Sequence, residues 1–310
     1  MKNKTVVFGS FVVDIMGRSP HLPIIGETVK GNLFKIGPGG KGFNQCVAAH
    51  KSGADVTMIT KLGKDSFADI ALNAMHDLHI NSNRIFISDE ASTGVALIMV
   101  DENTSQNKII VIPGACDTIT GEEIASTTDT LENCKYLLTQ LETNISSIEK
   151  VIDIAYKKGV NIILNPAPVQ NIDDKLLAKV TLITPNEVEA EILTGIPITS
   201  KQSADQAAEW FFSRGVKNVL ITLGKRGVYI SSNGKSDIIP AYSVHAVDTT
   251  GAGDAFNGGL LTALSEGKDL WEAAKFANAL AAISVQKIGS CPSMPTREEI
   301  DNFMLRFDLE

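Results

Sequence analysis

One short segment of the sequence combines glycines and an acid in a pattern that suits binding and transfer of an anionic group. Gly251, Ala252 and Gly253 precede a helix predicted over 255–264, and Asp254 follows them in its first turn. Backbone N–H groups at a helix N-terminus lack intrahelical partners, so those of the three residues can converge on a phosphate. A carboxylate facing that phosphate suits a base that takes a proton from an attacking hydroxyl. The segment alone equally fits an acid that only stabilises the helix dipole.

A second glycine-rich segment, Gly37–Gly42, has the G-x-G-x-x-G spacing of dinucleotide-binding turns. The strand predicted before it, Leu33–Ile36, is not the first of the chain, and Lys61 rather than an acid closes the next predicted strand. Nor is it a P-loop, because Lys41 is not followed by Ser or Thr. We therefore expect the glycines to bring a polar ligand close to the backbone, with Lys41 and Asn44 as donors. A dinucleotide-dependent oxidoreductase remains the alternative from a different class.

Polar residues also follow other predicted strands. Asn186 and Glu189 lie one turn apart, where they either help to position Mg²⁺ through its waters or only cap the helix. The glycine-bounded turn after Ile221, which ends at Gly227, suits a nucleotide phosphate or a plain hairpin. Glu142 ends a further strand, where an acid holds a sugar hydroxyl or caps a loop.

The loop Gln286–Ser293 is rich in Gly, Ser and Pro and follows a predicted small-residue helix. Its carbonyl and hydroxyl oxygens are suitable ligands for a monovalent cation if the loop lies beside Asp248. A simple connector is the other interpretation of this loop.

The elements that must position these residues alternate between strands and helices. Strands are predicted at Thr5–Gly9, Asp55–Thr60, Tyr136–Leu141, Asn161–Asn165, Leu182–Thr184, Asn218–Thr222 and Tyr242–Val247. Helices are predicted at Lys41–Ser52, Asp65–Leu78, Ser146–Lys158, Asn186–Leu193, Ala255–Leu264 and Ala273–Val285. The alternation indicates an α/β fold with a mainly parallel sheet covered on both faces, in which ligands bind beyond the carboxyl ends of the strands.

Two stretches, about 14–36 and 93–112, break this rhythm with alternating β patterns and turn residues but no helix. We expect them to form a small antiparallel sheet inserted into the α/β body, as a lid or a dimer contact. Ordinary surface hairpins are the alternative. No repeat, low-complexity tract or long linker divides the chain, so we expect one domain over residues 1–310.

Composition narrows the class of protein. The 310 residues are 44% hydrophobic, enough for a full core, and the net charge of −8 disfavours a nucleic-acid or anionic-membrane partner. No apolar run approaches the ~20 residues that span a bilayer. The first four residues lead into a predicted strand without a signal-peptide segment, so we expect a cytoplasmic protein. The four cysteines and five histidines show no metal-ligand spacing.

These motifs, in this order and over essentially the whole chain, resemble the ribokinase-like (PfkB) carbohydrate kinase family. Gly39–Gln45 resembles the sugar-binding signature of that family, and Asp248–Asp254 resembles its catalytic signature. Asn165–Pro168, Thr184–Glu187 and Ile221–Gly224 also match runs of the family. The resemblance implies a parallel sheet flanked by helices, with a small β-sheet lid that also forms a homodimer contact. It further implies ATP-dependent phosphorylation of the 5-hydroxyl of a pentose, converting D-ribose into D-ribose 5-phosphate.

The resemblance also assigns roles to residues. Asp254 would be the base, and the N–H groups of Gly251, Ala252 and Gly253 would bind the charge developing on the γ-phosphate. Sugar hydroxyls would be held by Asp14, Gly40, Lys41, Asn44 and Glu142. The ATP side would comprise Asn186, Thr222, Gly224, Gly227, Gly253 and Asn278, with Glu189 on the Mg²⁺–phosphate network. A K⁺ site would use Asp248, Thr250, Ser284, Lys287, Gly289 and Ser293, several of them through backbone carbonyls.

One departure from the family pattern concerns the sugar. Family members that act on ribose typically carry Asn two residues before the aspartate that matches Asp14, whereas this chain has Val12. Valine cannot hydrogen-bond a hydroxyl, and a buried unpaired hydroxyl costs about 1–3 kcal/mol, which erodes a preference for ribose over 2-deoxyribose by about tenfold or more. Members that act on 2-deoxyribose also have an apolar residue there. A 2-deoxy-D-ribose kinase is therefore the alternative, together with another small-sugar or nucleoside kinase of the family.

Overall fold

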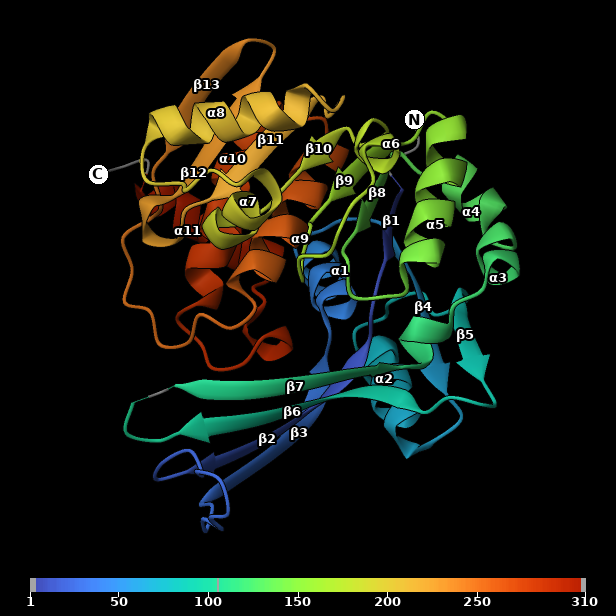
Figure 1. Ribbon diagram of the computed structural model, residues 1–310, viewed down its shortest axis with the longest axis vertical. Coiled ribbons are helices and arrows are strands. Elements are labelled where there is room, and N and C mark those ends of the chain that lie inside the picture. The colour runs from blue at the N-terminus through green and yellow to red at the C-terminus, as the bar shows by residue number, and fades with distance from the viewer. Residues whose placement is uncertain (1–3, 105, 308–310) are drawn as a thin grey trace.

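The computed structural model describes residues 4–104 and 106–307, in which two β-sheets are joined by helices (Figure 1). In the described part of the chain, nine strands form a large sheet in the order β13-β12-β11-β10-β9-β8-β1-β4-β5, and four form a small sheet in the order β3-β2-β6-β7. Three predictions involve residues outside these ranges. They concern the first residues of the chain, Met1–Asn3, a turn that includes Ser105, and the last residues of the single domain, 308–310.

The strands and helices have the following bounds. The large sheet comprises β1 (Thr5–Phe8), β4 (Val56–Gly63), β5 (Ile85–Ser88), β8 (Tyr136–Thr139), β9 (Asn161–Leu164), β10 (Leu182–Ile183), β11 (Asn218–Thr222), β12 (Val228–Ser232) and β13 (Lys235–Ile239). The small sheet comprises β2 (Val12–Ser19), β3 (Leu33–Gly39), β6 (Thr93–Asp101) and β7 (Asn107–Gly114). The helices are α1 (Lys41–Lys51), α2 (Ser66–Asp77), α3 (Gly121–Ala125), α4 (Thr128–Glu132), α5 (Ile145–Lys157), α6 (Asp174–Leu177), α7 (Glu187–Thr194), α8 (Lys201–Phe212), α9 (Ala252–Ser265), α10 (Leu270–Ser284) and α11 (Arg297–Phe307).

The large sheet is mainly parallel and buried on both faces, which confirms the predicted α/β fold. Pairing is parallel from β5 across to β11 and antiparallel from β11 to β13. In β1, Val7 points into the core under α1 and α9, while Val6 and Phe8 point into the core under α5 and α8. Because both faces are covered, the strand is a continuous apolar run rather than an alternating one.

The predicted strand over Tyr242–Val247 is wrong: these residues are irregular. Strand β13 ends at Ile239, directly before Pro240, which lacks the N–H that a further ladder needs. The apolar character of the segment has another cause, because Tyr242 packs edge-on against Phe303, with ring centroids 5.2 Å apart. Asp254 and its glycines therefore follow a loop rather than a strand.

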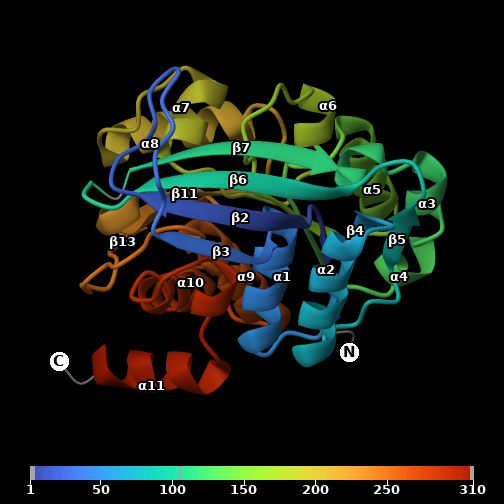
Figure 2. The same ribbon diagram turned by 90° about the horizontal axis from the view of Figure 1, so that it is seen from below.

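The expected small sheet is present, but it is mixed rather than antiparallel, because β2 pairs with β6 in parallel. The chain enters β2 from β1 and β6 from β5, so both strands run outward from the large sheet in the same direction. Val12 lies beside Gly94 in the register, and a Cβ at Gly94 would come within 2.9 Å of the Val12 side chain. Seen from below, the four strands lie in front of the large sheet and its helices (Figure 2). Within the described ranges, no helix is both long and apolar enough to cross a membrane.

Candidate active site

The N-terminus of α9 lies at the carboxyl-end side of the large sheet and offers unpartnered N–H groups. Gly251 precedes α9 with φ of 77°, and a Cβ there would lie 2.8 Å from the Cβ of Ser290. Ala252 donates its N–H to the carbonyl of Thr249 at 3.2 Å. Among the residues that the structure describes, the N–H groups of Gly251 and Gly253 have no partner. Two of the three N–H groups predicted to bind an anion are therefore free to do so, and the third is engaged.

A cavity of about 170 Å³ opens at this helix end. Its walls are Lys41, Asn165, Ala167, Thr184, Asn186, Glu189, Thr222, Thr249, Gly251, Ala252, Gly253, Asp254 and Asn257. The cavity thus joins the predicted base and anion-binding residues to one sugar-side residue, Lys41, and to three nucleotide-side residues.

Asp254 is buried at the cavity wall and accepts two hydrogen bonds from α1. Its side chain is 8% exposed. Asn44 donates from Nδ2 to Oδ2 at 3.1 Å, and Gln45 donates from Nε2 to Oδ1 at 2.9 Å. Burial raises the pKa of Asp254, although Lys41 and these two amides oppose the rise. A buried carboxylate of raised basicity with defined donors has the properties that proton abstraction requires.

The two predicted sugar-side carboxylates, Asp14 and Glu142, interact with each other and with Asp254. Glu142 accepts the backbone N–H of Lys41 at 2.8 Å and the hydroxyl of Ser10. Burial, then Glu142 and Asp254, raise the pKa of Asp14 to about 6. Burial disfavours the charged form of Lys41, but the carboxylates of Asp254 and Glu142 outweigh it and raise the pKa of its ammonium group. Lys41 therefore stays charged in the middle of an acidic site.

Asn44 and Val12 are the next residues predicted on the sugar side. Asn44 is buried, and its Oδ1 has no hydrogen-bond partner in the described part of the chain. A buried unsatisfied oxygen is unfavourable, so a ligand donor such as a sugar hydroxyl is its natural partner. Val12 is 2% exposed and shares the face of β2 with Asp14, two residues on. Gly40, with φ of 90°, is the residue directly before α1.

The glycine run before α1 serves helix packing rather than a dinucleotide. The strand before it, β3, belongs to the small sheet and not to the large one. A Cβ at Gly42 would lie 2.5 Å from the backbone of Gly9, so the glycine lets α1 approach the end of β1. This arrangement lacks the first strand–turn–helix unit in which dinucleotide-binding proteins hold the pyrophosphate.

Asn186 and Glu189 form a capping box at the start of α7. Asn186 Oδ1 accepts the N–H of Glu189 at 2.8 Å, and Glu189 Oε2 accepts the N–H of Asn186 at 2.8 Å. The capping alternative is therefore correct, yet both residues also line the cavity. Burial raises the pKa of Glu189. In the described ranges no group of three or more His, Cys, Asp or Glu residues is arranged to hold a metal ion.

The remaining nucleotide-side residues are less well placed. Thr222 lines the cavity, but Gly224, Gly227 and Asn278 do not. The turn at Gly227 joins β11 to β12 as a hairpin, and a Cβ there would lie 2.0 Å from the carbonyl oxygen of Ile239. Asn278 donates to the carbonyl of Pro240 at 3.3 Å.

The predicted cation loop is partly assembled around Asp248. Its carboxylate accepts the N–H of Thr250 at 2.9 Å and that of Gly289 at 2.9 Å, which ties together segments 41 residues apart. Partial burial disfavours ionisation, but the hydrogen bonds from Gly289 and Thr250 outweigh it and lower the pKa of Asp248. The side chains of Ser284, Lys287 and Ser293 instead bond to Ala281, Glu299 and Ser290.

Five cavity residues have no role predicted from the sequence: Asn165, Ala167, Thr184, Thr249 and Asn257. Thr184 donates its hydroxyl to Asn257 Oδ1 at 2.6 Å, and Asn257 Nδ2 donates to the carbonyl of Gly253 at 2.8 Å. Asn165 Nδ2 donates to the carbonyl of Thr184 at 3.1 Å. Asn165 and Thr184 come directly after β9 and β10, so the rule that ligands bind at strand carboxyl ends would have found them.

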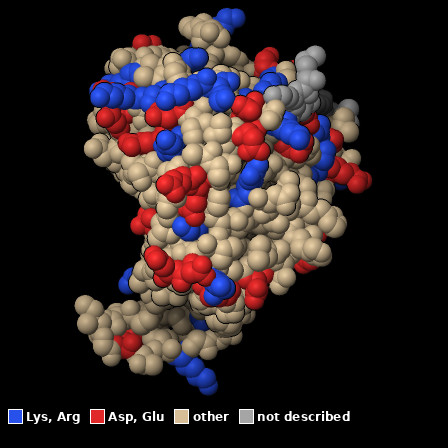
Figure 3. Space-filling view, turned by 90° about the vertical axis from the view of Figure 1, so that its right-hand side faces the viewer, with Lys and Arg blue, Asp and Glu red and all other residues tan. Residues whose placement is uncertain are grey.

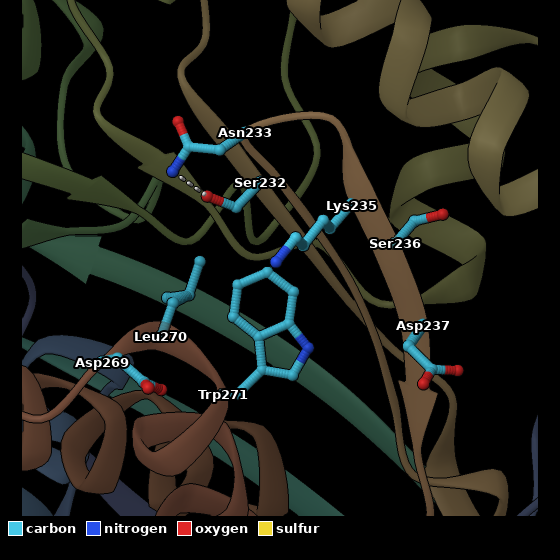
Figure 4. Close-up of a pocket in the computed structure, with 8 residues that line it drawn as sticks. All are labelled: Ser232, Asn233, Lys235, Ser236, Asp237, Asp269, Leu270 and Trp271. Atoms are coloured by element: carbon cyan, nitrogen blue, oxygen red, sulfur yellow. Dashed lines mark hydrogen bonds between the residues drawn. The ribbon is translucent and has the colours of Figure 1, made fainter.

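A second, larger hollow lies away from this site (Figure 4). Its volume is about 660 Å³, and it is lined by Ser232, Asn233, Lys235, Ser236, Asp237, Asp269, Leu270 and Trp271. The last residue of β12, Ser232, pairs with the first residue of β11, Asn218. This hollow therefore lies near the amino end of β11, whereas the cavity lies at its carboxyl end. None of the predicted site residues lines it.

The chain is similar to known proteins over nearly its full length. Residues 2–297 match the pfkB family carbohydrate kinases. The chain is 42% identical over 304 residues to the ribokinase of Haemophilus influenzae, covering 98% of this chain and 99% of that protein. It is 36% identical over 299 residues to the deoxyribokinase of Salmonella typhi, covering 96% and 97%. The solved structure of Arabidopsis thaliana ribokinase complexed with ribose and ATP superposes with a TM-score of 0.90 at 30% identity, covering 98% and 99%.

Proposed function

Because the chain belongs to the pfkB family of carbohydrate kinases, we propose that it transfers the γ-phosphate of ATP to the 5-hydroxyl of D-ribose, forming D-ribose 5-phosphate. The observation that carries this proposal is the buried Asp254 carboxylate beside two unpartnered N–H groups of α9 in one cavity. The similarity to ribokinases, one of them holding ribose and ATP, supports this pair of substrates.

In this mechanism Asp254 takes the proton of the attacking hydroxyl as the phosphoryl group is transferred. The N–H groups of Gly251 and Gly253 stabilise the negative charge that develops on that group. The N–H of Ala252 contributes once its hydrogen bond to the Thr249 carbonyl is broken. Phosphoryl transfer depends chiefly on such positioning and electrostatics. Mg²⁺, when bound, neutralises phosphate charge, and Asn186 and Glu189 are its proposed contacts through water.

The sugar is proposed to lie between the two sheets, against α1. Lys41, Glu142 and Asp14 offer one cation and two carboxylates to its hydroxyls, and Asn44 offers its unpartnered Oδ1. Gly40 is proposed to face the sugar through its backbone. A side chain does not fit there, because a Cβ would lie 2.8 Å from the backbone nitrogen of Val12. The adenosine part of ATP then extends toward Thr222, Gly224, Gly227 and Asn278.

The loop around Asp248 is proposed to bind K⁺. The ionised carboxylate and nearby backbone carbonyls form an oxygen-rich site, and the bonds to Thr250 and Gly289 hold the two segments together. Ser284, Lys287 and Ser293 are proposed to contribute backbone carbonyls, since their side chains are otherwise engaged.

The overall reaction is tested with a panel of pentoses, hexoses and nucleosides, each assayed with Mg-ATP in K⁺ and in tetramethylammonium buffers. We expect 5-phosphorylation of ribose and a lower rate without K⁺. Turnover of hexoses or nucleosides with no pentose phosphorylated would contradict the assignment. Equal rates in both buffers would remove the K⁺ site from the proposal without affecting the kinase reaction.

The Val12→Asn variant should raise the ratio of kcat/KM for ribose over 2-deoxyribose about tenfold or more, because it supplies a partner for the extra hydroxyl. Val12 is buried on the face of β2 that carries Asp14, so an amide there is directed toward the proposed sugar site. The measurement is direct competition of the two sugars. Val12→Ala, which removes bulk without adding a polar group, is the matched control and should leave the ratio unchanged.

The same experiment decides between the two sugars for the native chain. The similarity to the Salmonella typhi deoxyribokinase and the apolar Val12 favour 2-deoxyribose as the second candidate substrate. If the native enzyme prefers 2-deoxyribose, the alternative is correct. If Val12→Asn leaves the ratio unchanged, Val12 does not determine the choice of sugar.

The outer face of the small sheet is proposed as the homodimer contact, with this sheet acting as a lid over the sugar. Cross-strand register aligns Ile36, Ile15, Leu97 and Ile110 in one row, on the face opposite Asp14. Of these, Ile36, Leu97 and Ile110 are exposed, as are Phe34, Met99 and Ile112 on the same face. In the space-filling view the small sheet projects at the bottom and carries few charged side chains (Figure 3). A continuous exposed apolar face of this kind marks an association surface.

The Ile110→Glu variant should therefore dissociate the dimer. Two copies of the change would place two carboxylates in one apolar contact, and we expect the dissociation constant to rise by at least about 100-fold. Light scattering and sedimentation measure the mass at several concentrations. Leu305→Glu, at an equally exposed apolar residue on α11, is the control and should leave the mass unchanged. A native chain that is monomeric at all concentrations would contradict the proposed contact.

A further inference from the structure

We propose that Gln45 is a positioning residue that holds the Asp254 carboxylate in the orientation from which it accepts the substrate proton. This inference rests on the proposed role of Asp254 as base. Gln45 lies in α1, is fully buried, and donates from Nε2 to Asp254 Oδ1 at 2.9 Å. Among the described residues it is one of two side chains that donate to this carboxylate, and it does not line the cavity.

The orientation of the Gln45 amide is imposed by its neighbours. The carbonyl of Thr184 accepts only, so Asn165 must direct Nδ2 toward it, at 3.1 Å, and its Oδ1 toward Gln45. Gln45 Nε2 therefore donates one hydrogen to Asn165 Oδ1, at 3.0 Å, and the other to Asp254 Oδ1. On the other side, Gln140 Nε2 donates to Gln45 Oε1 at 2.6 Å. A flipped amide would place oxygen against two oxygens and nitrogen against a donor.

The second donor to Asp254 is placed differently. Asn44 donates to Oδ2 at 3.1 Å, but its own Oδ1 has no partner among the described residues. Asn44 is therefore available to a ligand, whereas Gln45 has three partners and no exposure. We assign Gln45 the constant contact that stays with Asp254 while ligands enter and leave.

Six charged or donor groups act on Asp254 and together determine its pKa. Lys41, Asn44 and Gln45 from α1 lower the pKa of Asp254. The like charges that face it are Glu142 in the loop after β8, Asp14 in β2 and Glu189 in α7. The hydrogen bond from Gln45 lowers the pKa of Asp254, against the rise that burial causes. Without this donor, the pKa of Asp254 therefore rises further. Only ionised Asp254 accepts a proton, so the fall of kcat on the acid side must then begin at higher pH.

The test is kcat as a function of pH at saturating sugar and ATP. In Gln45→Met, which keeps the size but removes the donor, the acid limb should move up by about 1–2 pH units. The Gln45→Glu variant keeps the shape of the side chain and adds a second carboxylate beside Asp254. Its acid limb should move further in the same direction. The KM for ATP should be unchanged in both variants.

The matched control is Thr262→Val. The Thr262 hydroxyl lies 2.7 Å from the Ser52 hydroxyl, and this buried pair joins the same two helices, α1 and α9, two turns beyond Asp254. We expect Thr262→Val to lower Tm without moving the acid limb. The comparison separates loss of helix packing from loss of positioning.

The results divide clearly. A kcat lowered equally at every pH in Gln45→Met and Gln45→Glu, with an unmoved acid limb, would overturn the proposal, because Gln45 would then only support packing. If Gln45→Met does not fold, the isosteric Gln45→Glu alone decides by the same criterion. Failure of the proposed base gives a different result, a near-native rate in Asp254→Asn, and is therefore distinguishable from failure of the Gln45 assignment.

Discussion

The Asp254→Asn variant should lose between about 10²- and 10⁴-fold in kcat, because an amide cannot take the proton of the attacking hydroxyl. Its affinity for ATP should change little, since the N–H groups of Gly251 and Gly253 are backbone groups and stay in place. The fold should persist as well: Asn44 can turn its unpartnered Oδ1 toward the new amide. Steady-state kinetics, calorimetric titration with ATP and Tm measure the three quantities.

The control is Asp69→Asn. Asp69 is an exposed acid in the first turn of α2, and Asp254 is the acid in the first turn of α9. An acid there stabilises its helix by about 0.3–1 kcal/mol through the dipole. Asp69→Asn should therefore lower Tm slightly and leave kcat unchanged. If Asp254→Asn behaved in the same way, Asp254 would be only a helix-dipole acid.

The second large effect is expected for Gly251→Ala, with a loss of about 10²–10³-fold in kcat, the usual result of removing one preorganised donor to a developing charge. Gly251 has φ of 77°, and the added Cβ would lie 2.8 Å from the Cβ of Ser290. The residue must move, and the N–H groups at the start of α9 then lose their common direction. Single-turnover kinetics with bound ATP measures the transfer step directly.

Gly267→Ala provides the comparison for this variant. Gly267 follows the other end of α9, also has a positive φ, of 91°, and has open space where a Cβ would stand. Both variants carry left-handed backbone strain of about 1–2 kcal/mol, so Tm should fall in both. Only Gly251→Ala should lose rate. Equal and near-native rates in the two variants would mean that the N–H groups of Gly251 and Gly253 do not act on the transferred group.

Local signals in the sequence were sufficient for most elements and for some of the site. The strand at Asn218–Thr222 was predicted with its observed bounds, and the helix after Asp65 begins where Asp65 caps it. Asn186 and Glu189 were placed together because a capping box spans only four residues. Such interactions join near neighbours in the chain, and short-range spacing predicts them well.

The errors arose where a pattern had a distant cause. Tyr242–Val247 has the apolar character of a strand because Tyr242 packs on Phe303, 61 residues away in the printed sequence, and not because a neighbouring strand pairs with it. The alternation in β2 and β6 correctly predicted strands but not their direction. Parallel pairing of those two strands depends on where β1 and β5 end in the large sheet.

By itself, the sequence determined the α/β fold, the helix N-terminus at Gly251–Asp254 and the polar residues that follow the strands. Only the tertiary structure decided what surrounds Asp254. Asn44 and Gln45 reach it from 210 and 209 residues away because α1 packs closely on α9, where a Cβ at Gly258 would lie 2.4 Å from that of Ala48. Helix ends follow from hydrogen bonds within one turn of chain, whereas the donors to a buried carboxylate follow from how two distant helices pack on the same sheet.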